Sequence, residues 1–424
     1  MIDIRLLREN PDLFRAAARN KRFEADVDAV YETDLQIRAL KVEVETLRSE
    51  RNRVSKSIGK SKPEERERAL DEARMLREQL EAKEPELREL ELRLDQLLLT
   101  LPNLPSPEAP IGATEDDNVE LRRWGSPRAF EFEPRDHVDI ANSLDLADFN
   151  RGGKVSGSRF YYLKNDGALL QMAVLRFAVD FLVGRGFSPM VVPELVREEA
   201  MTGTGYFPVG RDDAYSLEKD GLFLVGTSEV SLVAYHRDEI LTLDELPRRY
   251  CGISSCFRRE AGAAGKDTRG FYRVHQFQKV EQVVICENDP ELIAAEHQAL
   301  VSNVEGILQA LELPYRVAVA CTGEMGMGQV YKTEIESWMP SRQRYSETHS
   351  CSTLGEFQSR RLGIRYRDSK GVVRHCATLN NTAIASPRIL IPILETYQQA
   401  DGSVRIPTVL QPYLGGRSEL KPRG

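Results

Sequence analysis

The stretch Phe257–Glu281 reads FRREAGAAGKDTRGFYRVHQFQKVE and carries the most specific pattern in the chain. Two arms in which charged and aromatic residues alternate flank a loop of small residues, which is typical of a long β-hairpin. One face of this hairpin would collect Arg258, Glu260, Arg273 and Glu281. A charged sheet face does not build a core. Because arginine matches phosphate oxygens and carboxylate matches an amine, the pattern predicts a site for a ligand with both groups; the alternative is a solvated hairpin with cross-strand ion pairs.

Length, charge and cysteine content indicate the broad class. The chain has 424 residues, enough for two or three domains, and a net charge of −8, so any nucleic-acid surface must be local. Its six cysteines form no C-x-x-C pair, which disfavours a zinc site. The start Met1–Arg5 lacks the apolar segment of a signal peptide, and no run approaches a membrane span. We therefore expect a reduced, cytoplasmic protein without membrane contact.

The first hundred residues predict two long helices. Apolar residues recur at spacings of three and four through Val30–Ile58 and again through Ala69–Leu101. Glycine and proline within Gly59–Pro63 break the pattern, so the helices must pair antiparallel to bury their apolar stripes. We expect a coiled-coil arm at about residues 27–101 that projects about 50 Å. Pro85 lies inside the second helix and predicts a kink there.

Basic side chains gather near the tip of this predicted arm. They include Arg48, Arg51, Arg53, Lys56 and Lys60, whereas acidic residues crowd the second helix. A basic tip on an acidic chain indicates a contact with a phosphate backbone. The alternative is a spacer or a dimerisation element.

A Pro-rich stretch, Pro102–Pro110, marks a domain boundary. We expect an N-terminal helical unit at 1–104, a linker at 105–117, a catalytic domain at 118–416 and a polar tail at 417–424. Beyond the linker, short β-like runs alternate with helices, which indicates an α+β fold. A P-loop is excluded because the first glycine of that motif is missing. A Rossmann motif and a Gly-x-Ser-x-Gly elbow are also absent. Phosphate binding must therefore use other residues.

The hairpin stretch resembles motif 2 of the class II aminoacyl-tRNA synthetases, in the form F-R-x-E-A-G, loop, R-V-H-Q-F-x-K-V-E of the bacterial-type seryl-tRNA synthetases. Four more segments extend the resemblance along nearly the whole chain. They are similar to motif 1 (Gly186–Pro193), the T-x-E loop (Leu224–Glu229), the E-x-x-S segment (Tyr345–Ser352) and motif 3 (Thr378–Arg388). Taken alone, motif 1 is also an ordinary helix–strand unit, and Thr-x-Glu is more often a helix cap.

The resemblance implies a fold and an activity. The fold is a two-helix arm followed by a catalytic domain with an antiparallel β-sheet flanked by helices. The activity is ATP-dependent activation of L-serine to seryl-adenylate, then transfer to the 3′ end of serine tRNA and also of selenocysteine tRNA, by a homodimer that uses Mg²⁺. The arm would grip the long variable arm of the tRNA. The alternatives are a paralogue that serves a non-translational acceptor or antibiotic resistance, and a non-catalytic tRNA-binding homologue.

The resemblance also implies site residues. The catalytic set is Arg258, Arg388 and Glu347. The serine-binding set is Thr227, Ser228, Glu229, Arg258, Glu281 and Thr382. The ATP-binding set is Arg258, Arg259, Glu260, Arg273, Val274, Phe277, Glu347, Thr348, His349, Ser350 and Arg388. Glu347 and Ser350 would contact the metal, since Mg²⁺ prefers oxygen ligands.

Several positions depart from the usual family pattern while leaving every charged catalytic group in place. They are Ser231, Thr348, His349, Asn381, Ser386 and the pair Thr333–Glu334. These departures bear on serine specificity and efficiency rather than on the fold or ATP binding.

Overall fold

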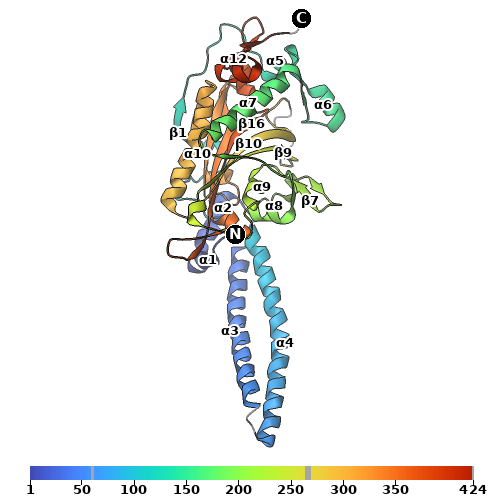
Figure 1. Cartoon of the computed structure of the whole chain (residues 1–424), viewed down its shortest axis with the longest axis vertical. Coiled ribbons are helices and arrows are strands. Elements are labelled where there is room, and N and C mark those ends of the chain that lie inside the picture. The colour runs from blue at the N-terminus through green and yellow to red at the C-terminus, as the bar shows by residue number, and fades with distance from the viewer. Residues whose placement is uncertain (59–61, 263–268, 423–424) are drawn as a thin grey trace. The chain divides into compact units, whose positions relative to one another are not determined.

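The computed structural model describes residues 1–58, 62–262 and 269–422, which form two compact units (Figure 1). One unit is Ile2–Pro102, and the other is Asn103–Gly424 together with Met1. All six cysteines are buried and unpaired, so they belong to the packed interior. In the described part of the chain, no helix combines the length and the apolar character needed to cross a membrane.

The N-terminal unit is built on two long helices preceded by two short ones: α1 (Ile4–Glu9), α2 (Pro11–Lys21), α3 (Val27–Ile58) and α4 (Pro63–Thr100). Helices α3 and α4 run side by side (Figure 1), and Leu40, Val44 and Leu80 are buried between them. The predicted two-helix arm is thereby confirmed. Helix α4 continues through Pro85, so the proline does not end it.

The second unit is organised around one eight-stranded sheet. In spatial order its strands are β1 (Val119–Trp124), β11 (Tyr315–Val319), β12 (Tyr331–Met339), β13 (Arg344–Gly355), β16 (Ala377–Ser386), β10 (Gln276–Cys286), β9 (Arg248–Phe257) and β4 (Ser188–Val191). Every neighbouring pair is antiparallel except β4 with β9, which is parallel. The predicted antiparallel sheet is confirmed.

Shorter elements surround this sheet. The helices are α5 (His137–Ser143), α6 (Phe149–Ser156), α7 (Asn165–Val183), α8 (Glu198–Thr204), α9 (Glu229–Ala234), α10 (Pro290–Ala310), α11 (Phe357–Leu362) and α12 (Leu390–Tyr397). In one three-stranded sheet, β7 (Leu222–Leu224) lies between β5 (Leu195–Arg197) and β6 (Ser216–Leu217). In another, β14 (Arg365–Arg367) lies between β8 (Ile240–Leu241) and β15 (Val373–His375). Two further sheets have two strands each, β2 (Ala147–Asp148) with β3 (Tyr162–Leu163) and β17 (Val404–Arg405) with β18 (Glu419–Leu420).

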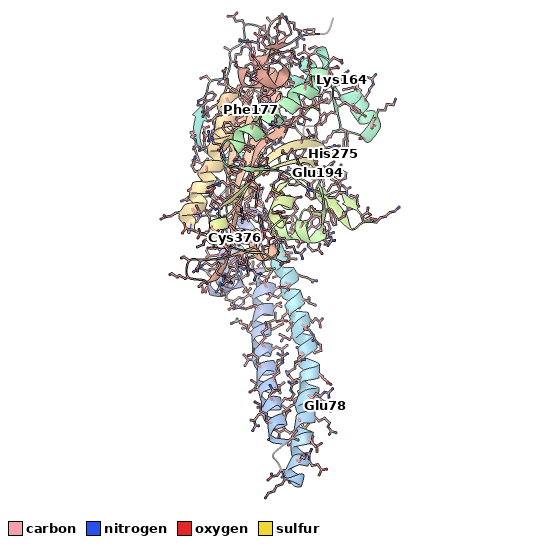
Figure 2. All side chains as sticks on the ribbon, viewed as in Figure 1. Glu78, Lys164, Phe177, Glu194, His275 and Cys376 are labelled. Carbon is pink, nitrogen blue, oxygen red and sulfur yellow. The ribbon has the colours of Figure 1, made fainter. Side chains whose placement is uncertain are left out.

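The two faces of strand β10 separate the core from the site. Val280 and Val284 pack into the main hydrophobic core with helices α7 and α10, where Phe177 of α7 (Figure 2) is also buried. Lys279 and Glu281 alternate with them and therefore lie on the opposite face. The side-chain period of two thus explains how one strand supplies both core residues and charged residues.

The hairpin differs in one respect from its prediction. Strand β9 ends at Phe257 and β10 begins at Gln276, opposite Phe257, so Arg258, Glu260 and Arg273 lie on the connection and not on paired strands. The amide of Arg258 still donates to the carbonyl of His275 at 2.9 Å, but Glu260 adopts a left-handed conformation with φ of 52°. This conformation turns the chain out of the ladder. The prediction that one face of a regular hairpin collects all four charged residues is therefore wrong, because only Glu281 lies on a paired strand.

Candidate active site

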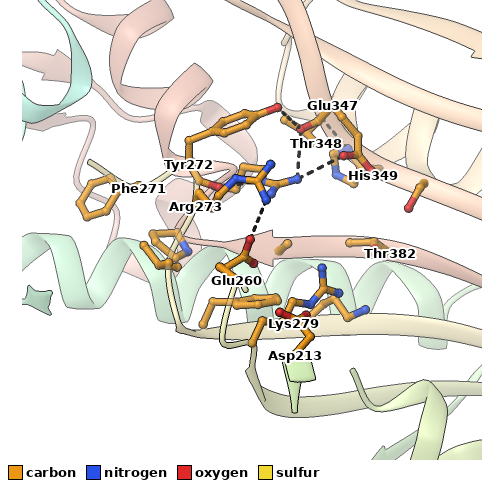
Figure 3. A pocket seen from close by; sticks show the side chains of 17 residues that line it. Asp213, Glu260, Phe271, Tyr272, Arg273, Lys279, Glu347, Thr348, His349 and Thr382 are labelled. Atoms are coloured by element: carbon orange, nitrogen blue, oxygen red, sulfur yellow. Dashed lines mark hydrogen bonds and ion pairs between the residues drawn. The ribbon is translucent and has the colours of Figure 1, made fainter. Parts of the chain in front are cut away.

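A cavity of about 290 Å³ lies where the connection between β9 and β10 meets strands β13 and β16 (Figure 3). Most residues predicted to bind ATP line it: Arg258, Glu260, Arg273, Val274, Phe277, Glu347, Thr348, His349, Ser350 and Arg388. Thr382, predicted to bind serine, also lines the cavity. Arg259 is not among the lining residues; its side chain is exposed, and its backbone N–H donates to the carbonyl of Asp213 at 2.9 Å.

Arg258 connects the hairpin to the T-x-E loop. Its Nε donates to the carbonyl of Gly226 at 3.3 Å, just before Thr227. Its guanidinium lies 5.4 Å from the ring centroid of Phe277. A guanidinium held by such contacts at a polar cavity can stabilise charge developing on a phosphate without first reorganising.

Glu260 and Arg273 lie on opposite limbs of the connection and are bound to each other. Nη1 of Arg273 is 2.6 Å from Oε2 of Glu260 (Figure 3). The side chain of Glu260 is only 12% exposed, which strengthens a charge-assisted hydrogen bond relative to a surface pair. The ion pair fixes the connection beside the cavity.

Arg388, which follows β16, reaches Glu347 of β13 across the cavity. Its Nη1 lies 3.6 Å from Oε2 of Glu347, and its Nε donates to the carbonyl of Tyr272 at 3.1 Å. Burial alone would raise the pKa of Glu347, but Lys332 and Arg388 outweigh it and hold this pKa below its ordinary value. Glu347 is therefore ionised at neutral pH.

A β-bulge explains why Glu347 and Ser350 lie together although they are three residues apart. On an ideal strand such residues point to opposite faces. Here the pairing of β13 with β12 slips at Thr348, because His349 opposes Ile335 while Glu347 opposes Glu336. The extra residue reverses the alternation, and both Glu347 and Ser350 line the cavity.

Glu347 and Ser350 supply only part of the oxygen ligands that a Mg²⁺ ion needs. An ionised carboxylate and a hydroxyl at one cavity are oxygen ligands of the kind that Mg²⁺ takes, with substrate phosphates completing the sphere. Within the described ranges, no group of three histidine, cysteine or acidic side chains could hold a metal ion alone. Glu347 and Ser350 thus fit a metal that arrives with a nucleotide.

Thr348 and His349, which depart from the family pattern, are tied to each other. The hydroxyl of Thr348 hydrogen-bonds to Ser337 at 2.8 Å and donates to the carbonyl of Ile335 at 3.2 Å. Nδ1 of His349 lies 2.8 Å from the same hydroxyl. Burial lowers the pKa of His349 to about 3, so the ring is neutral at physiological pH and adds no charge to the site.

Two acidic side chains from separate segments converge beside the cavity. Nδ2 of Asn380 donates to Oε2 of Glu229 at 3.2 Å and to Oε1 of Glu281 at 3.0 Å. The hydroxyl of Thr382 donates to Oε2 of Glu281 at 3.2 Å. The structure therefore brings together Glu229, Glu281 and Thr382, all predicted from separate motifs to bind serine.

The T-x-E loop combines a local contact to its own backbone with a binding position. Oγ1 of Thr227 accepts the backbone N–H of Glu229 at 3.2 Å, at the start of α9. Thr227 and Ser228 are both buried, and the hydroxyl of Ser228 has no hydrogen-bond partner in the part of the chain that the structure describes. The loop thus presents Glu229 toward Glu281 while Thr227 holds its backbone.

Sequence reasoning missed four residues at this end of the site. They are Tyr206, Lys279, Gln358 and Asn380. Tyr206 donates to Oε2 of Glu229 at 3.1 Å, and Gln358 donates to Oε1 of Glu229 at 2.7 Å. Asn380 and Lys279 were within reach of sequence analysis, because each lies two residues from a predicted ligand on the same strand face. Tyr206 offered no such signal.

The two carboxylates differ in their charge compensation. Glu281 has an ammonium partner, since Nζ of Lys279 is 2.5 Å from its Oε2. Glu229 accepts hydrogen bonds from the neutral donors Tyr206, Gln358 and Asn380. Burial, and then the nearby Glu281, raise the pKa of Glu229. An incoming ammonium group would relieve both effects.

The other departures from the family pattern are bonded away from the cavity lining. Ser231 donates to the carbonyl of Pro193 at 2.6 Å, Asn381 to the carbonyl of Leu300 at 3.0 Å, and Ser386 to Gln171 at 2.8 Å. On β12, Thr333 is 2.9 Å from His297, and Glu334 is 2.5 Å from Lys332. These substitutions therefore alter the support of the site and not its lining.

The predicted tRNA-binding residues lie near the end of α3. Arg53 and Lys56 are exposed, Arg51 is half-buried, and Arg48 is held by Glu84 of α4 at 2.8 Å. Lys60 lies outside the described residues. Arg48 therefore contributes to pairing of the two helices, and the more available charges are those closer to the tip.

Comparison with known proteins agrees with this arrangement. The family model of the seryl-tRNA synthetase N-terminal domain matches residues 1–105, and that of the class II synthetase core domain (G, H, P, S and T) matches residues 215–397. The chain is 52% identical over 420 residues to the serine–tRNA ligase of Deinococcus radiodurans, with 99% of each covered, and 47% identical over 426 residues to that of Streptomyces coelicolor, with 100% and 99% covered.

Solved structures agree over the same length. The seryl-tRNA synthetase of Pyrococcus horikoshii complexed with ATP superposes with a TM-score of 0.94 at 39% identity, with 100% of both chains covered. The cytoplasmic serine–tRNA ligase of Naegleria fowleri in complex with AMP gives a TM-score of 0.89 at 32% identity, with 100% of this chain and 99% of that one covered. A helical arm, an antiparallel sheet and converging motifs 2 and 3 thus coincide with full-length similarity, and the chain belongs to the seryl-tRNA synthetases of class II.

Proposed function

We propose that this protein activates L-serine with ATP and transfers the seryl group to the 3′ end of serine tRNA, and also of selenocysteine tRNA. The observation that carries the proposal is the convergence of Glu229 and Glu281 through Asn380. This acidic pair lies beside a cavity that Arg258 and Arg388 line. Together they offer one end for an ammonium group and another for phosphates.

The first step needs alignment and charge neutralisation and not a general base. The serine carboxylate is already a nucleophile at neutral pH, so the protein must hold it in line with the α-phosphorus. In our proposal Arg258 holds the α-phosphate, Phe277 stacks on the adenine, and Glu260 binds the adenine edge. Glu229 and Glu281 hold the serine ammonium or hydroxyl.

We assign binding of the outer phosphates of ATP to Arg388 and to a Mg²⁺ ion that Glu347 and Ser350 would hold. The metal supplies charge neutralisation on the phosphates when it is bound. Arg388 is already oriented toward this place by Tyr272 and Glu347. In the second step a terminal ribose hydroxyl of the tRNA attacks the seryl-adenylate, which releases AMP.

The remaining roles concern partners and location. We assign tRNA binding to Arg51, Arg53, Lys56 and Lys60, with a smaller part for Arg48. The edge strand β4, where Val191 is 84% exposed, supports a homodimer through motif 1. A translation enzyme of this kind acts in the cytoplasm. The proposed domains are a helical unit at 1–104, a linker at 105–117, a catalytic domain at 118–416 and a polar tail at 417–424.

Two assays test the proposal against its alternatives. Serine-dependent exchange of pyrophosphate into ATP measures adenylate formation, and charging of serine tRNA measures transfer. A paralogue with another acceptor would show exchange without charging, and a non-catalytic homologue would show neither. The presence of Arg258 and Arg388 in the cavity favours catalysis.

Replacing Thr382 by valine should weaken the preference for serine over alanine by a few-fold to about tenfold. Valine keeps the shape but removes the hydroxyl that donates to Glu281. The measurement is kcat/KM in pyrophosphate exchange for both amino acids. Ser386→Ala is the matched control, because it removes a hydroxyl from the same strand that is bonded to Gln171 instead. An unchanged ratio in Thr382→Val would place the hydroxyl contact elsewhere.

Serine binding should weaken as the pH falls. Burial and Glu281 raise the pKa of Glu229, so this carboxyl takes up a proton at a higher pH than an ordinary glutamic acid. The neutral form no longer compensates the serine ammonium, so KM for serine should begin to rise at a pH above the ordinary glutamic-acid pKa of about 4.3 and keep rising as the pH falls, while KM for ATP changes less. Glu229→Gln should start with a high KM and lose most of this slope. Parallel slopes for the variant and the wild type would contradict the assignment.

A further inference from the structure

Lys279 is a buried cation that the mechanism above leaves without a role. It lies on β10 between Phe277 and Glu281, on the strand face that turns toward the site. Its side chain is 5% exposed, and its Nζ lies 2.5 Å from Oε2 of Glu281. Lys279 also lines the cavity (Figure 3). A buried lysine at a ligand cavity carries a desolvation cost, which makes its partner important.

The neighbouring charges show why Lys279 differs from the cavity arginines. Arg273 is engaged by Glu260 and Arg388 faces Glu347, and both of those carboxylates lie at the nucleotide end. The partner of Lys279 is instead Glu281, a carboxylate proposed to hold the substrate ammonium. One Glu281 oxygen already accepts from Lys279 and Thr382, and the other accepts from Asn380. An ammonium ligand therefore competes with Lys279 for Glu281.

We propose that Lys279 exchanges partners when serine binds, an inference that rests on the proposed function. The serine ammonium takes the place of Lys279 as the counter-ion of Glu281. The released ammonium of Lys279 then pairs with the serine carboxylate. Because serine is a zwitterion, one internal ion pair is replaced by two intermolecular ones, and no charge stays buried alone.

The same contact acts during adenylate formation. A serine carboxylate oxygen forms a bond to the α-phosphorus while the bond from that phosphorus to the bridging oxygen breaks, and pyrophosphate leaves with the electron pair. Lys279 keeps its protons throughout. Its position between Phe277, proposed to stack on adenine, and Glu281 places its charge at the junction of carboxylate and α-phosphate.

Serinamide separates this role from simple neutralisation of Glu281. It keeps the ammonium and hydroxyl of serine but lacks the negative charge, so binding it leaves Lys279 without a partner. Calorimetric titration of the full chain should show wild-type protein preferring serine to serinamide by at least about tenfold. Lys279→Gln, whose amide can still donate to Glu281, should bring the two affinities within about threefold, and kcat/KM for serine in exchange should fall about 100-fold.

The alternative role of Lys279, simple neutralisation of Glu281, predicts a different result. If Lys279 only neutralises Glu281, its removal frees that carboxylate, and serine and serinamide should both bind more tightly in Lys279→Gln; this result would overturn the proposal. Lys279→Arg keeps the charge and should keep the preference for serine. Lys83→Met breaks a lysine–glutamate pair at the same 2.5 Å separation between α4 and α3, outside the cavity lining, so the preference should persist in it.

A second pair of variants keeps the test valid if Lys279→Gln does not fold. Glu281→Gln leaves the charge of Lys279 in place, whereas Lys279→Gln with Glu281→Gln removes both charges of the buried pair. The single variant should prefer serine over serinamide, and the double variant should not. Equal preferences would overturn the proposal. Wild-type protein that shows no serine-dependent exchange would instead refute the proposed function itself.

Discussion

Replacing Arg258 by alanine should lower serine-dependent pyrophosphate exchange by about 10²–10³ while the protein stays folded. The guanidinium is oriented in advance by the Gly226 carbonyl and the Phe277 ring. A cation placed in this way stabilises charge that reorganises at the α-phosphorus in the transition state, and alanine leaves that charge uncompensated. The loss should therefore appear mainly in kcat.

Arg259→Ala is the matched comparison for this prediction. It removes the same side chain one residue further along the connection, where it is exposed and outside the cavity lining. We expect a much smaller loss than in Arg258→Ala, although the family pattern assigned both residues to ATP. Exchange kinetics should be read beside thermal unfolding of each variant. Near-normal exchange in a folded Arg258→Ala protein would show that the phosphate site lies elsewhere.

Deleting the arm should separate the two half-reactions. A variant in which a short Gly/Ser linker replaces Val27–Leu101 should still form seryl-adenylate, because every residue that lines the cavity belongs to the other unit. Charging of serine tRNA should fall steeply, since the phosphate contacts of the tip are lost. Full charging by the arm-less protein would make the arm a spacer or a dimerisation element.

Charge reversal tests the tip without removing the arm. The triple variant Arg51→Glu, Arg53→Glu and Lys56→Glu should reduce charging less severely than the deletion does. It should also make charging less dependent on salt, because binding with fewer phosphate contacts releases fewer counterions. Arg88→Glu with Arg93→Glu is the control, because it reverses exposed charges on α4 far along the chain from the tip. Equal losses in both sets would indicate a general charge effect.

Local patterns in the sequence were enough for the long helices, and the resemblance to the class II motifs supplied most of the cavity lining. The three-and-four spacing from Val30 to Ile58 predicted α3, and the residues quoted from motifs 2 and 3 predicted Arg258, Thr382 and Arg388. Periodic spacing can be interpreted without a relative because helix and strand geometry determine which residues share a face. The same logic misjudged the hairpin, since a left-handed Glu260 turned the chain before Arg273 could pair on a strand.

The sequence by itself therefore determined the arm, the antiparallel sheet and most of the charged residues that line the cavity, although not Asp213 or Lys279. Only the tertiary structure decided that Asn380 donates hydrogen bonds to both Glu229 and Glu281. It alone placed the hydrogen-bond donors Gln358 and Tyr206 against Glu229, and the ammonium group of Lys279 against Glu281. It also decided that a bulge at Thr348 turns Glu347 and Ser350 to the same cavity. These contacts join segments distant in the chain, and they depend on how strands register and pack rather than on any local period.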